Sequence, residues 1–327
     1  LIPPATEIGI CTAAATSRRT AKGSFPSICW SLVGVHCPID QQMEGKDPFA
    51  VLREVAAAVQ IPISVAGGIN SETAATAIAA GASVVVVGGA ITKAENAEDA
   101  TRRIKRVIQS GVAEKTDLFK RGGAADVREL LAKPSVPNIS DGYHHMPVLS
   151  GLAPVVPGVH MVGRALTVRA YPGDWAKPVE AIDEAEPGDV IVIDAGGVPP
   201  ALWGELATHS AVQRKLAGVV IHGAIRDTPE IRKLKFPAFA RHVTARAGEP
   251  KGFGEINVPI EIEGIRIEPG DWIVGDDDGV IVVPQRNAVE IANRAMDRLE
   301  FENRLRKEIQ AGSTLGKVAD LYKWEKR

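Results

Sequence analysis

Residues 188–227 contain two short apolar runs separated by a helix-length segment, and this pattern most strongly limits what the chain can fold into. The runs are 190–193 and 218–221, each bounded by glycine and polar turn residues. Such runs predict buried strands, and the amphipathic segment between them predicts a connecting helix. Glu205 opens that helix, and Arg226 and Asp227 follow the second strand. We therefore expect two carboxylates and a guanidinium to meet at one sheet edge, which predicts a site for a small anion and a divalent cation.

The first half of the chain repeats the alternation of strand and helix. Strands are predicted at 31–36, 61–66 and 83–87. The intervening helices are predicted at 47–59, at 71–80 with Ser71 as the cap, and at 97–109. Strands that alternate with helices indicate a parallel sheet whose two faces are covered. The predicted fold class is therefore α/β.

Paired glycines end two consecutive strands of this first half. Gly67 and Gly68 follow one strand, and Gly88 and Gly89 follow the next. Glycine lets backbone N–H groups approach an anion closely, and the loops after strands seven and eight of a (β/α)₈ barrel commonly bind phosphate in this way. We expect a phosphate site here. The alternative is that both pairs only form tight turns.

The composition changes after residue 111, where a charged stretch leads to Pro134 and Pro137. Proline cannot continue a helix, so this region predicts a domain boundary, which we place near residue 115. We expect an irregular, altered or truncated start over residues 1–30, a partial barrel over 31–114, and a second domain over 115–327.

The second domain is predicted to open with a helix at 124–132 and a turn at 138–142, followed by a strand at 163–170. Short strands between 258 and 284, bounded by Gly, Pro and Asp, predict a β-rich layer that caps the α/β unit. A long helix is predicted at 287–310. Residues 276–279 resemble a calcium loop but lack its later ligands, so we expect a tight turn.

Composition excludes several functional classes. The 327 residues carry a net charge of −2, which gives no broad basic field for nucleic acid. No apolar run approaches the ~20 residues that span a bilayer. Cys11, Cys29 and Cys37 all lie near the N-terminus, so neither a disulfide framework nor a zinc site is expected. We therefore expect a cytoplasmic protein without membrane or nucleic-acid partners.

The first half carries a set of strand-end motifs at His36, 39–42, 45–48, 65–69 and 86–91. These motifs resemble the C-terminal half of 3-hexulose-6-phosphate synthase, of the orotidine-monophosphate decarboxylase suprafamily. The resemblance implies a partial (β/α)₈ barrel that binds a sugar phosphate. The catalytic Asp-x-Lys-x-x-Asp pattern of that family does not occur before His36. Condensation of formaldehyde with ribulose 5-phosphate is therefore kept as an alternative function.

The second half carries motifs along most of its length, at residues 139–141, 163–165, 187–190, 204–205, 223–227, 267–271 and 277–284. They resemble the RraA-like family, which includes the regulator of ribonuclease activity A and metal-dependent 4-hydroxy-4-methyl-2-oxoglutarate aldolases that also decarboxylate oxaloacetate. The resemblance implies an RraA-like α/β swivelling domain. The aldolases carry an acid, twenty residues and then Arg-Asp, and Glu205 followed by Arg226 and Asp227 satisfies this spacing.

A lyase acting on a 2-oxo acid must hold a carboxylate and stabilise a growing enolate. Mg²⁺ or Mn²⁺ supplies a Lewis acid for the keto oxygen, and Asp227 is the expected ligand. Arg226 is expected to bind the substrate carboxylate or keto oxygen, because its planar fork adds geometry to charge. Glu205 is assigned to the metal through a water, as ligand or base. The alternative reading of Arg226 and Asp227 is a simple ion pair.

Further contributions to this site are expected from the helix that begins near Gly204. Its first backbone N–H groups, at Leu206 and Ala207, are predicted to bind the same substrate carboxylate. The family resemblance implies a homotrimer or hexamer with sites between subunits, to which Glu302 of a neighbouring subunit would add a metal ligand. The pair His144 and His145 either lines the pocket or lies in a solvated loop.

The favoured function is thus a metal-dependent aldolase or decarboxylase of small 2-oxo acids, fused to a hexulose-phosphate-synthase-like segment. A non-catalytic binding protein of the ribonuclease-regulator type is the alternative from another class. The set Glu205, Arg226 and Asp227 favours the enzyme, because a binding surface has no need of it.

Overall fold

The computed structural model describes residues 32–319, apart from 48, 95 and 117–120. The expected irregular start over 1–30 lies outside the described residues. Contacts divide the chain into two compact units between Arg121 and Gly122. This division and the predicted boundary near residue 115 both fall between the helix α5 (Ala97–Ser110) and the 3-10 helix η1 (Ala124–Asp126).

The first unit contains a parallel sheet of the order β1-β2-β3. Its strands are β1 (Val33–His36), β2 (Ile63–Ala66) and β3 (Val84–Val86). Its helices are α1 (Ile39–Met43), α2 (Ala50–Ala58), α3 (Ala74–Ala79), α4 (Gly89–Thr92) and α5. The predicted alternation of strands and helices is confirmed. Three strands in one sheet do not establish a (β/α)₈ barrel, which stays a prediction.

In this unit, asparagine side chains bind backbone N–H groups at the start of α5 and in the turn before α3. Asn96 accepts hydrogen bonds from the N–H groups of Glu98 and Asp99 and so caps α5. The cap predicted at Ser71 was wrong, because α3 begins after Thr73 and the Asn70 side chain binds the N–H groups of the turn before it. The strands and helices enclose an apolar core around Leu52, Val65 and Val107.

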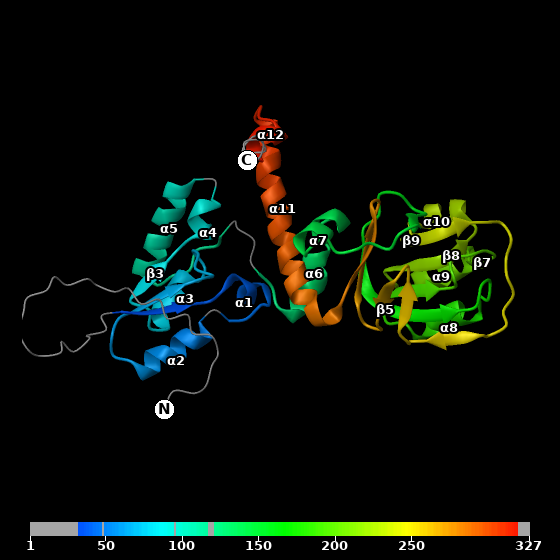
Figure 1. The fold of residues 1–327 in the computed structure, drawn as a ribbon, viewed down its shortest axis with the longest axis horizontal. Helices are drawn as coiled ribbons and strands as arrows, with labels where there is room; N and C mark the ends of the chain where they lie inside the picture. The colour runs from blue at the N-terminus through cyan, green and yellow to red at the C-terminus, as the bar shows by residue number, and fades with distance from the viewer. Residues whose placement is uncertain (1–31, 48, 95, 117–120, 320–327) are drawn as a thin grey trace, which may run out of the picture. The chain divides into compact units, whose positions relative to one another are not determined.

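The second unit is built on a nine-stranded sheet of the order β14-β13-β5-β6-β8-β9-β4, with β10 paired to β5 and β7 to β8 (Figure 1). The four central strands are parallel. The bounds are β4 (Ala153–Pro154), β5 (Met161–Ala170), β6 (Val190–Asp194), β7 (Ala201–Trp203), β8 (Gly218–Ile225), β9 (Ala238–Val243), β10 (Gly254–Ile256), β13 (Trp272–Asp276) and β14 (Gly279–Val283). A bridge joins Ile281 of β14, at one end of this order, to Val148 in the segment just before β4, the strand at the other end, so the sheet nearly closes on itself.

The two faces of this sheet carry different cores. One face packs against α8 (Ala176–Glu184), α9 (Glu205–Gln213) and α10 (Thr228–Leu234) through residues such as Ile191 and Ile221. The other face lies against the hairpin of β11 (Ile260–Ile262) and β12 (Ile265–Ile267). Strand β8 is buried along its whole length, as the continuous apolar run predicts. The predicted strand–helix–strand unit is confirmed as β6, α9 and β8.

The β-rich layer predicted for the late strands does not exist as a separate layer. Strand β13 pairs with β5 and β14 pairs with β13, so both extend the main sheet, because β5 offers them a free hydrogen-bonding edge. Only β11 and β12 form their own two-stranded sheet. The tight turn at residues 276–279 is confirmed as the β13–β14 connection, where the Asp276 and Asp277 carboxylates accept backbone N–H groups of other segments.

A helical group accompanies the sheet. It consists of α6 (Val127–Leu131), α7 (Val136–Gly142), the 3-10 helix η2 (Gln285–Asn287), α11 (Ala288–Gln310) and α12 (Leu315–Val318). In Figure 1, α6 and α7 lie beside α11, with which both are in contact. The turn predicted at 138–142 was wrong, because Ser135 and Asn138 form a capping box that starts α7. Within the described residues, no helix has the length and apolar character needed to cross a membrane.

Candidate functional site

A cavity of about 260 Å³ opens in the second unit where the ends of β7 and β8 meet α8 and α9. Six of the seven residues predicted for the catalytic site line it, and Glu302 does not. The six are Gly204, Glu205, Leu206, Ala207, Arg226 and Asp227. The parallel strands explain this convergence, because β7 and β8 both end at the same edge and α9 begins there.

The backbone after β8 turns sharply to present Arg226 and Asp227. The Arg226 N–H donates to the carbonyl oxygen of Trp203 at 3.0 Å, which ties the end of β8 to the end of β7. Asp227 has φ 59° and ψ 32°, a left-handed conformation that is uncommon for residues other than glycine. Such conformations concentrate at functional sites, where the surrounding structure maintains them.

The Asp227 carboxylate is held from two sides through one oxygen. Its Oδ2 accepts the Glu205 N–H at 3.2 Å and lies 3.3 Å from Nε of Arg226. Its Oδ1 has no partner among the described residues. The Asp227 side chain is 37% exposed and that of Arg226 43% exposed. One carboxylate oxygen and the end of the guanidinium are therefore accessible to a ligand.

Close packing explains the glycine at position 204. A Cβ there would lie 2.5 Å from Oδ2 of Asp227 and 3.2 Å from Cγ of Arg226. Gly204 has an extended backbone, with φ −156°, so the absence of a side chain is required by this approach and not by the backbone dihedral. Any larger residue would displace the Asp227 carboxylate from the first turn of α9.

The first turn of α9 supplies polar groups to the cavity. Gly204 makes no side-chain cap, and the first N–H groups of any α-helix lack intrahelical acceptors. The N–H of Glu205 is bound by Asp227, while Leu206 and Ala207 lie next in this turn. The Glu205 carboxylate lies 3.5 Å from Nε2 of His209, one turn further along the helix. A substrate carboxylate at this end would meet N–H donors and a guanidinium together.

Most of the remaining cavity wall is apolar, and sequence reasoning missed it. Val179 comes from α8 and Trp175 from the turn before it. Further apolar groups come from Ala201, Leu202, Trp203 and Ala247, and Ser210 of α9 adds a hydroxyl group. The Trp203 indole is fixed by a 2.9 Å hydrogen bond to Oγ1 of Thr208.

Asp174 holds the segment that carries Trp175. Its buried carboxylate accepts hydrogen bonds from the N–H groups of Ala176, Lys251 and Phe253 at 2.8–3.1 Å. Burial raises the pKa of Asp174, but these backbone hydrogen bonds outweigh burial and leave the pKa below its ordinary value. The charged carboxylate thus fixes the start of α8 against the 251–253 loop.

The donors present suit a magnesium-type ion with few protein ligands. No group of three or more His, Cys, Asp or Glu side chains that could hold a metal occurs in the described part of the chain. Mg²⁺ commonly binds one or two carboxylates and keeps several waters, so the free oxygen of Asp227 and a nearby Glu205 fit it. A zinc-type cage with three or four protein ligands does not fit these residues.

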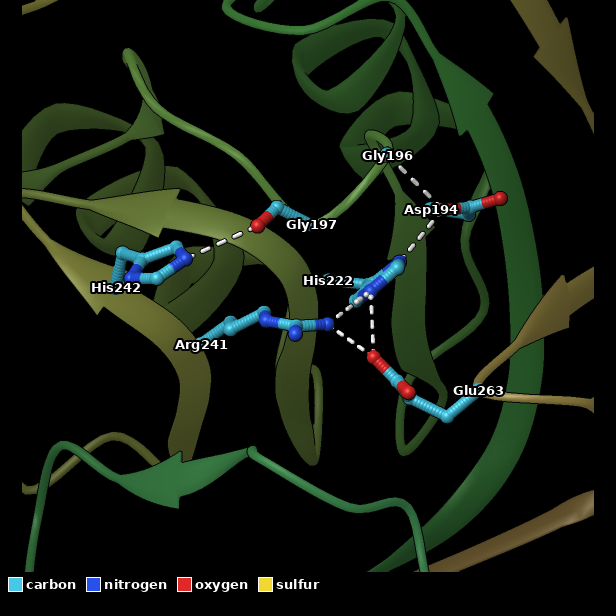
Figure 2. Close-up of polar contacts among 7 residues, drawn as sticks. All are labelled: Asp194, Gly196, Gly197, His222, Arg241, His242 and Glu263. Atoms are coloured by element: carbon cyan, nitrogen blue, oxygen red, sulfur yellow. Dashed lines mark hydrogen bonds and ion pairs between the residues drawn. The ribbon is translucent and has the colours of Figure 1, made fainter.

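A second polar cluster lies at the neighbouring strands β6, β8 and β9 and was also missed (Figure 2). Nδ1 of His222 lies 2.8 Å from Oδ1 of Asp194, and Nε2 of His222 lies 3.0 Å from Arg241. Arg241 also pairs with Glu263 of the β11–β12 hairpin. Figure 2 shows the four side chains forming one chain of contacts across these elements. Its sequence signal was a histidine inside the otherwise apolar run of β8.

The polar side chains of this second cluster are hydrogen-bonded to one another and to nearby backbone groups. Oδ1 of Asp194 accepts the Gly196 N–H as well as binding His222. The backbone at Gly197 packs closely against His222, since a Cβ at position 197 would lie 2.6 Å from Nε2 of the imidazole. His242 binds the carbonyl oxygen of Gly197 at 3.0 Å. The cluster therefore fixes the loop from β6 to β7, and this loop leads to Trp203 and Gly204.

Other predicted residues lie away from the cavity of this chain. Glu302 lies on α11, where its Oε2 accepts from the Asn138 side chain at 2.8 Å and its Oε1 lies 3.1 Å from Arg298. His144 and His145 do not line the cavity, and His145 pairs with Asp141 at 3.2 Å on an exposed surface. The role of Glu302 in a neighbouring subunit stays a prediction.

The glycine pairs of the first unit lie at one sheet edge. Gly67 and Gly68 follow β2, and Gly88 and Gly89 follow its parallel neighbour β3. Gly67 and Gly68 have φ 94° and 72°, and a Cβ at Gly67 would lie 2.3 Å from the carbonyl oxygen of Cys37. Both a tight turn and a close approach thus require glycine at position 67.

Two family models match the chain. The model of the RraA-like family, described as Aldolase/RraA, matches residues 136–282, which include the six cavity residues but not Glu302. A family of unknown function, DUF561, matches residues 34–117. The resemblance of the first unit to 3-hexulose-6-phosphate synthase therefore stays a prediction.

Several curated relatives match at substantial identity. An uncharacterised protein of Methanocaldococcus jannaschii is 36% identical over 195 residues, which cover 59% of this chain and 93% of that protein. A putative 4-hydroxy-4-methyl-2-oxoglutarate aldolase of Halalkalibacterium halodurans is 42% identical over 147 residues, covering 45% of this chain and 70% of the relative. A 4-hydroxy-4-methyl-2-oxoglutarate aldolase of Thermus thermophilus is 34% identical, over 38% of this chain and 75% of the relative.

Solved structures show the same fold. An uncharacterised protein from Pseudomonas syringae superposes with a TM-score of 0.54 at 32% identity, covering 59% of this chain and 96% of that chain. RraAS2 of Streptomyces coelicolor, described as an unusual member of the RNase ES inhibitor RraA protein family, gives a TM-score of 0.51 at 28% identity, over 56% and 98% of the two chains.

Proposed function

Because the chain belongs to the RraA-like family, we propose that its second unit is a divalent-metal-dependent carbon–carbon lyase acting on small 2-oxo acids. Relatives named as 4-hydroxy-4-methyl-2-oxoglutarate aldolases support a lyase. The observation that carries the proposal is that Arg226, Asp227 and the first turn of α9 converge on one cavity. Aldol cleavage and oxaloacetate decarboxylation both leave a pyruvate enolate, so one site serves both reactions.

The proposed roles follow from the contacts. Asp227 would hold Mg²⁺ or Mn²⁺ through its free oxygen, with Glu205 reaching the ion through a water. When bound, the ion supplies Lewis-acid polarisation of the keto oxygen. Oδ2 of Asp227 stays bound to the Glu205 N–H, so the carboxylate is oriented before the ion arrives.

Arg226 and the α9 N-terminus bind the reacting end of the substrate. The guanidinium donates to the carboxylate or keto oxygen, and the N–H groups of Leu206 and Ala207 add neutral donors on the other side. Charge that develops on the enolate oxygen is thus met by groups already in place, which lowers the barrier. Glu205, at the same turn and beside His209, is placed to accept the proton of a 4-hydroxyl group through water.

One assay tests this proposal. The purified protein is incubated with oxaloacetate and Mg²⁺ or Mn²⁺, and pyruvate formation is compared with Arg226→Ala and Asp227→Ala. We expect each variant to lose at least about 100-fold in kcat/KM, as for removal of a group that stabilises transition-state charge. Addition of a chelator should abolish the wild-type rate. Equal, metal-independent rates for all three proteins would remove the lyase proposal.

The same assay distinguishes the alternative of a non-catalytic regulator. A regulator would show no turnover while retaining a partner surface, and the trimer or hexamer implied by the family would be its binding form. Sedimentation of the intact protein tests that assembly. A trimer that turns over no 2-oxo acid would favour the regulator.

For the first unit, we propose a phosphate site at the glycine pairs of β2 and β3. Its support is that both pairs lie at the carboxyl edge of neighbouring parallel strands. Calorimetric titration with ribulose 5-phosphate tests binding, with Gly88→Asp as the variant expected to abolish it. Added formaldehyde tests synthase activity, which we do not expect, because the catalytic strand motif is missing before His36.

A further inference from the structure

His222 is a buried polar residue in the otherwise apolar strand β8, and charged groups from three other segments contact its ring (Figure 2). Nδ1 lies 2.8 Å from Oδ1 of Asp194 on β6. Nε2 lies 3.0 Å from Nη1 of Arg241 on β9 and 3.4 Å from Oε1 of Glu263, in the turn between β11 and β12. Strand β7, which also pairs with β8, carries no titratable side chain. The ring therefore has an acceptor at Nδ1 and both a donor and an acceptor at Nε2.

These contacts assign the charge state of the ring. A guanidinium has only donors, so the contact with Arg241 requires that Nε2 accept a hydrogen bond. An ionised Asp194 carboxylate has only acceptors, so Nδ1 carries the hydrogen. A neutral imidazole with its hydrogen on Nδ1 meets both requirements, and a charged imidazolium does not.

Protonation of Nε2 would exchange one partner of the ring for another. The imidazolium and the Arg241 guanidinium would be two positive charges 3.0 Å apart, which repel each other. The new Nε2–H would instead donate to Glu263, whose carboxylate is already 3.4 Å away. Arg241 would then lose the imidazole and share its other partner, Glu263, with it. Nδ1 keeps its bond to Asp194 in both states.

The backbone at Glu263 gives independent support. Ile262 pairs with Ile265, so Glu263 and Gly264 form a two-residue hairpin loop, with φ 50° and 77°. Positive φ at both positions favours asparagine, aspartate or glycine, and a glutamate there is unfavourable. The chain nevertheless places a carboxylate at this position, where it contacts both Arg241 and His222. The hairpin thus holds, against its own backbone preference, the acceptor that a protonated ring requires.

The loop from β6 to β7 packs on the same edge of the ring. The Gly197 N–H donates to the carbonyl oxygen of His222 at 3.1 Å, and a Cβ at Gly197 would lie 2.6 Å from Nε2 and 3.1 Å from Nη1 of Arg241. A movement of Arg241 away from Nε2 therefore acts directly on this backbone. His242 donates to the carbonyl oxygen of Gly197 through Nε2, a bond that it keeps whether or not its own ring is protonated.

We infer that His222 is a positioning residue for the proposed reaction, and that only its neutral form holds the β6–β7 loop in the active arrangement. This inference rests on the proposed function, because the loop acts through β7, which ends at Trp203. The carbonyl oxygen of Trp203 accepts the Arg226 N–H, and Gly204 follows at the start of α9. We expect protonation of His222 to displace Arg226 and the first turn of α9 together.

Kinetics at several pH values test the inference with His222→Gln, which keeps a neutral polar group and cannot take up a proton. The measurement is kcat/KM for oxaloacetate with Mg²⁺ between about pH 8 and about pH 5.5, the range in which histidine changes charge, after subtraction of the rate without protein. We expect the ratio of wild type to His222→Gln to fall by at least about threefold toward the acid end. Other titrating groups, such as His209, act equally in both proteins and cancel in the ratio. A ratio that stays constant would overturn the inference.

Glu263→Gln tests the exchange of partners in a second variant that keeps His222. Without the charge of Glu263, a protonated ring has lost its new acceptor but still faces Arg241. The acid fall in kcat/KM should therefore move to lower pH by at least about half a unit. The matched control is Glu261→Gln, at an exposed position of β11 in the same hairpin, which should leave the profile unchanged. An unchanged profile in Glu263→Gln, or an equal shift in Glu261→Gln, would contradict the exchange.

Nitrogen-15 NMR of the histidine rings reads the charge state without turnover. Comparison of wild type with His222→Gln identifies the ring signals of His222. At about pH 8 we expect a neutral ring with its hydrogen on Nδ1. A hydrogen on Nε2 at this pH would overturn the inference.

Turnover separates this inference from the lyase proposal. A wild type that turns over no 2-oxo acid would refute the lyase and the positioning role together. Metal-dependent turnover with a constant ratio of wild type to His222→Gln would refute the positioning role and leave the lyase standing.

Discussion

Gly204 shows how one residue without a side chain organises the candidate site. The Cβ atom of any other residue at position 204 would lie only 2.5 Å from Oδ2 of Asp227, which is too close for both atoms to keep their places. We expect Gly204→Ala to lower kcat/KM for oxaloacetate by about 10- to 100-fold, because small displacements of catalytic groups have effects of this size. The steady-state assay with Mg²⁺ measures it.

A matched glycine provides the control for that substitution. Gly123 also has a negative φ, and a Cβ there meets nothing within 4 Å, so Gly123→Ala should leave the rate unchanged. Wild-type activity in Gly204→Ala would show that Asp227 does not need its present position.

Asp174 gives the second prediction at this scale, a dependence of stability on pH. A carboxyl group whose pKa is lowered in the folded state stabilises the protein above its unfolded pKa, about 3.8, and this contribution is lost as the pH falls through the lower folded value. Asp174→Asn should cost about 1–3 kcal/mol of unfolding free energy at pH 7. The difference from wild type should shrink below pH 4.

Urea denaturation at several pH values measures this effect. Asp183→Asn, at an exposed position of the same helix α8, is the control and should change stability by less than about 0.5 kcal/mol. A difference between wild type and Asp174→Asn that stays constant from pH 7 to pH 3 would contradict the assignment.

The residues of the site differ in how far the sequence could predict them. Glu205, Arg226 and Asp227 carry charge at strand and helix ends, where a sequence pattern indicates chemistry. Trp175 and Val179 line the same cavity but have no chemical signature. Their role depends on where α8 packs, and packing is decided by contacts between segments distant in sequence.

At the scale of helices and strands, the wrong predictions come from local sequence rules for turns and short strands. A turn was predicted at 138–142, directly after Pro137, a residue that cannot continue a helix. Proline is nevertheless compatible with the first turn of a helix, and the Ser135 cap makes this segment the start of α7. Strand β7 escaped prediction because it has only three residues and follows two prolines. The parallel pairing of β6 with β8 was predictable, since its two apolar runs and the helix between them agree.

The cluster around His222 joins four elements and should stabilise them together. His222 and Asp194 are largely buried, so removal of the imidazole leaves a carboxylate and Arg241 with poorer partners. We expect His222→Gln to cost about 1–3 kcal/mol of unfolding free energy. Thermal and urea denaturation measure the loss.

A matched exposed pair provides the comparison. His145 contacts Asp141 through the same atoms at 3.2 Å, but its side chain is 84% exposed against 11% for His222. His145→Gln should change stability by less than about 0.5 kcal/mol, since exposed ion pairs contribute little. Equal effects of the two substitutions would show that burial of the His222 cluster does not matter.

For the whole molecule, the distribution of cores predicts how far the parts depend on each other. Both core clusters of the main sheet and every residue lining the cavity lie after Gly122. The first unit has a separate core. A unit with its own core and site should fold alone.

We therefore expect residues 122–327, produced alone, to unfold cooperatively and to keep kcat/KM for oxaloacetate within about twofold of the full chain. Circular dichroism and the metal-dependent assay measure the two properties, and the same fragment with Asp227→Ala is the inactive control. A fragment that folds but loses activity would show that residues before 122 contribute to catalysis. A fragment that fails to fold would show that the second unit, although compact by its contacts, needs residues before 122 for its stability.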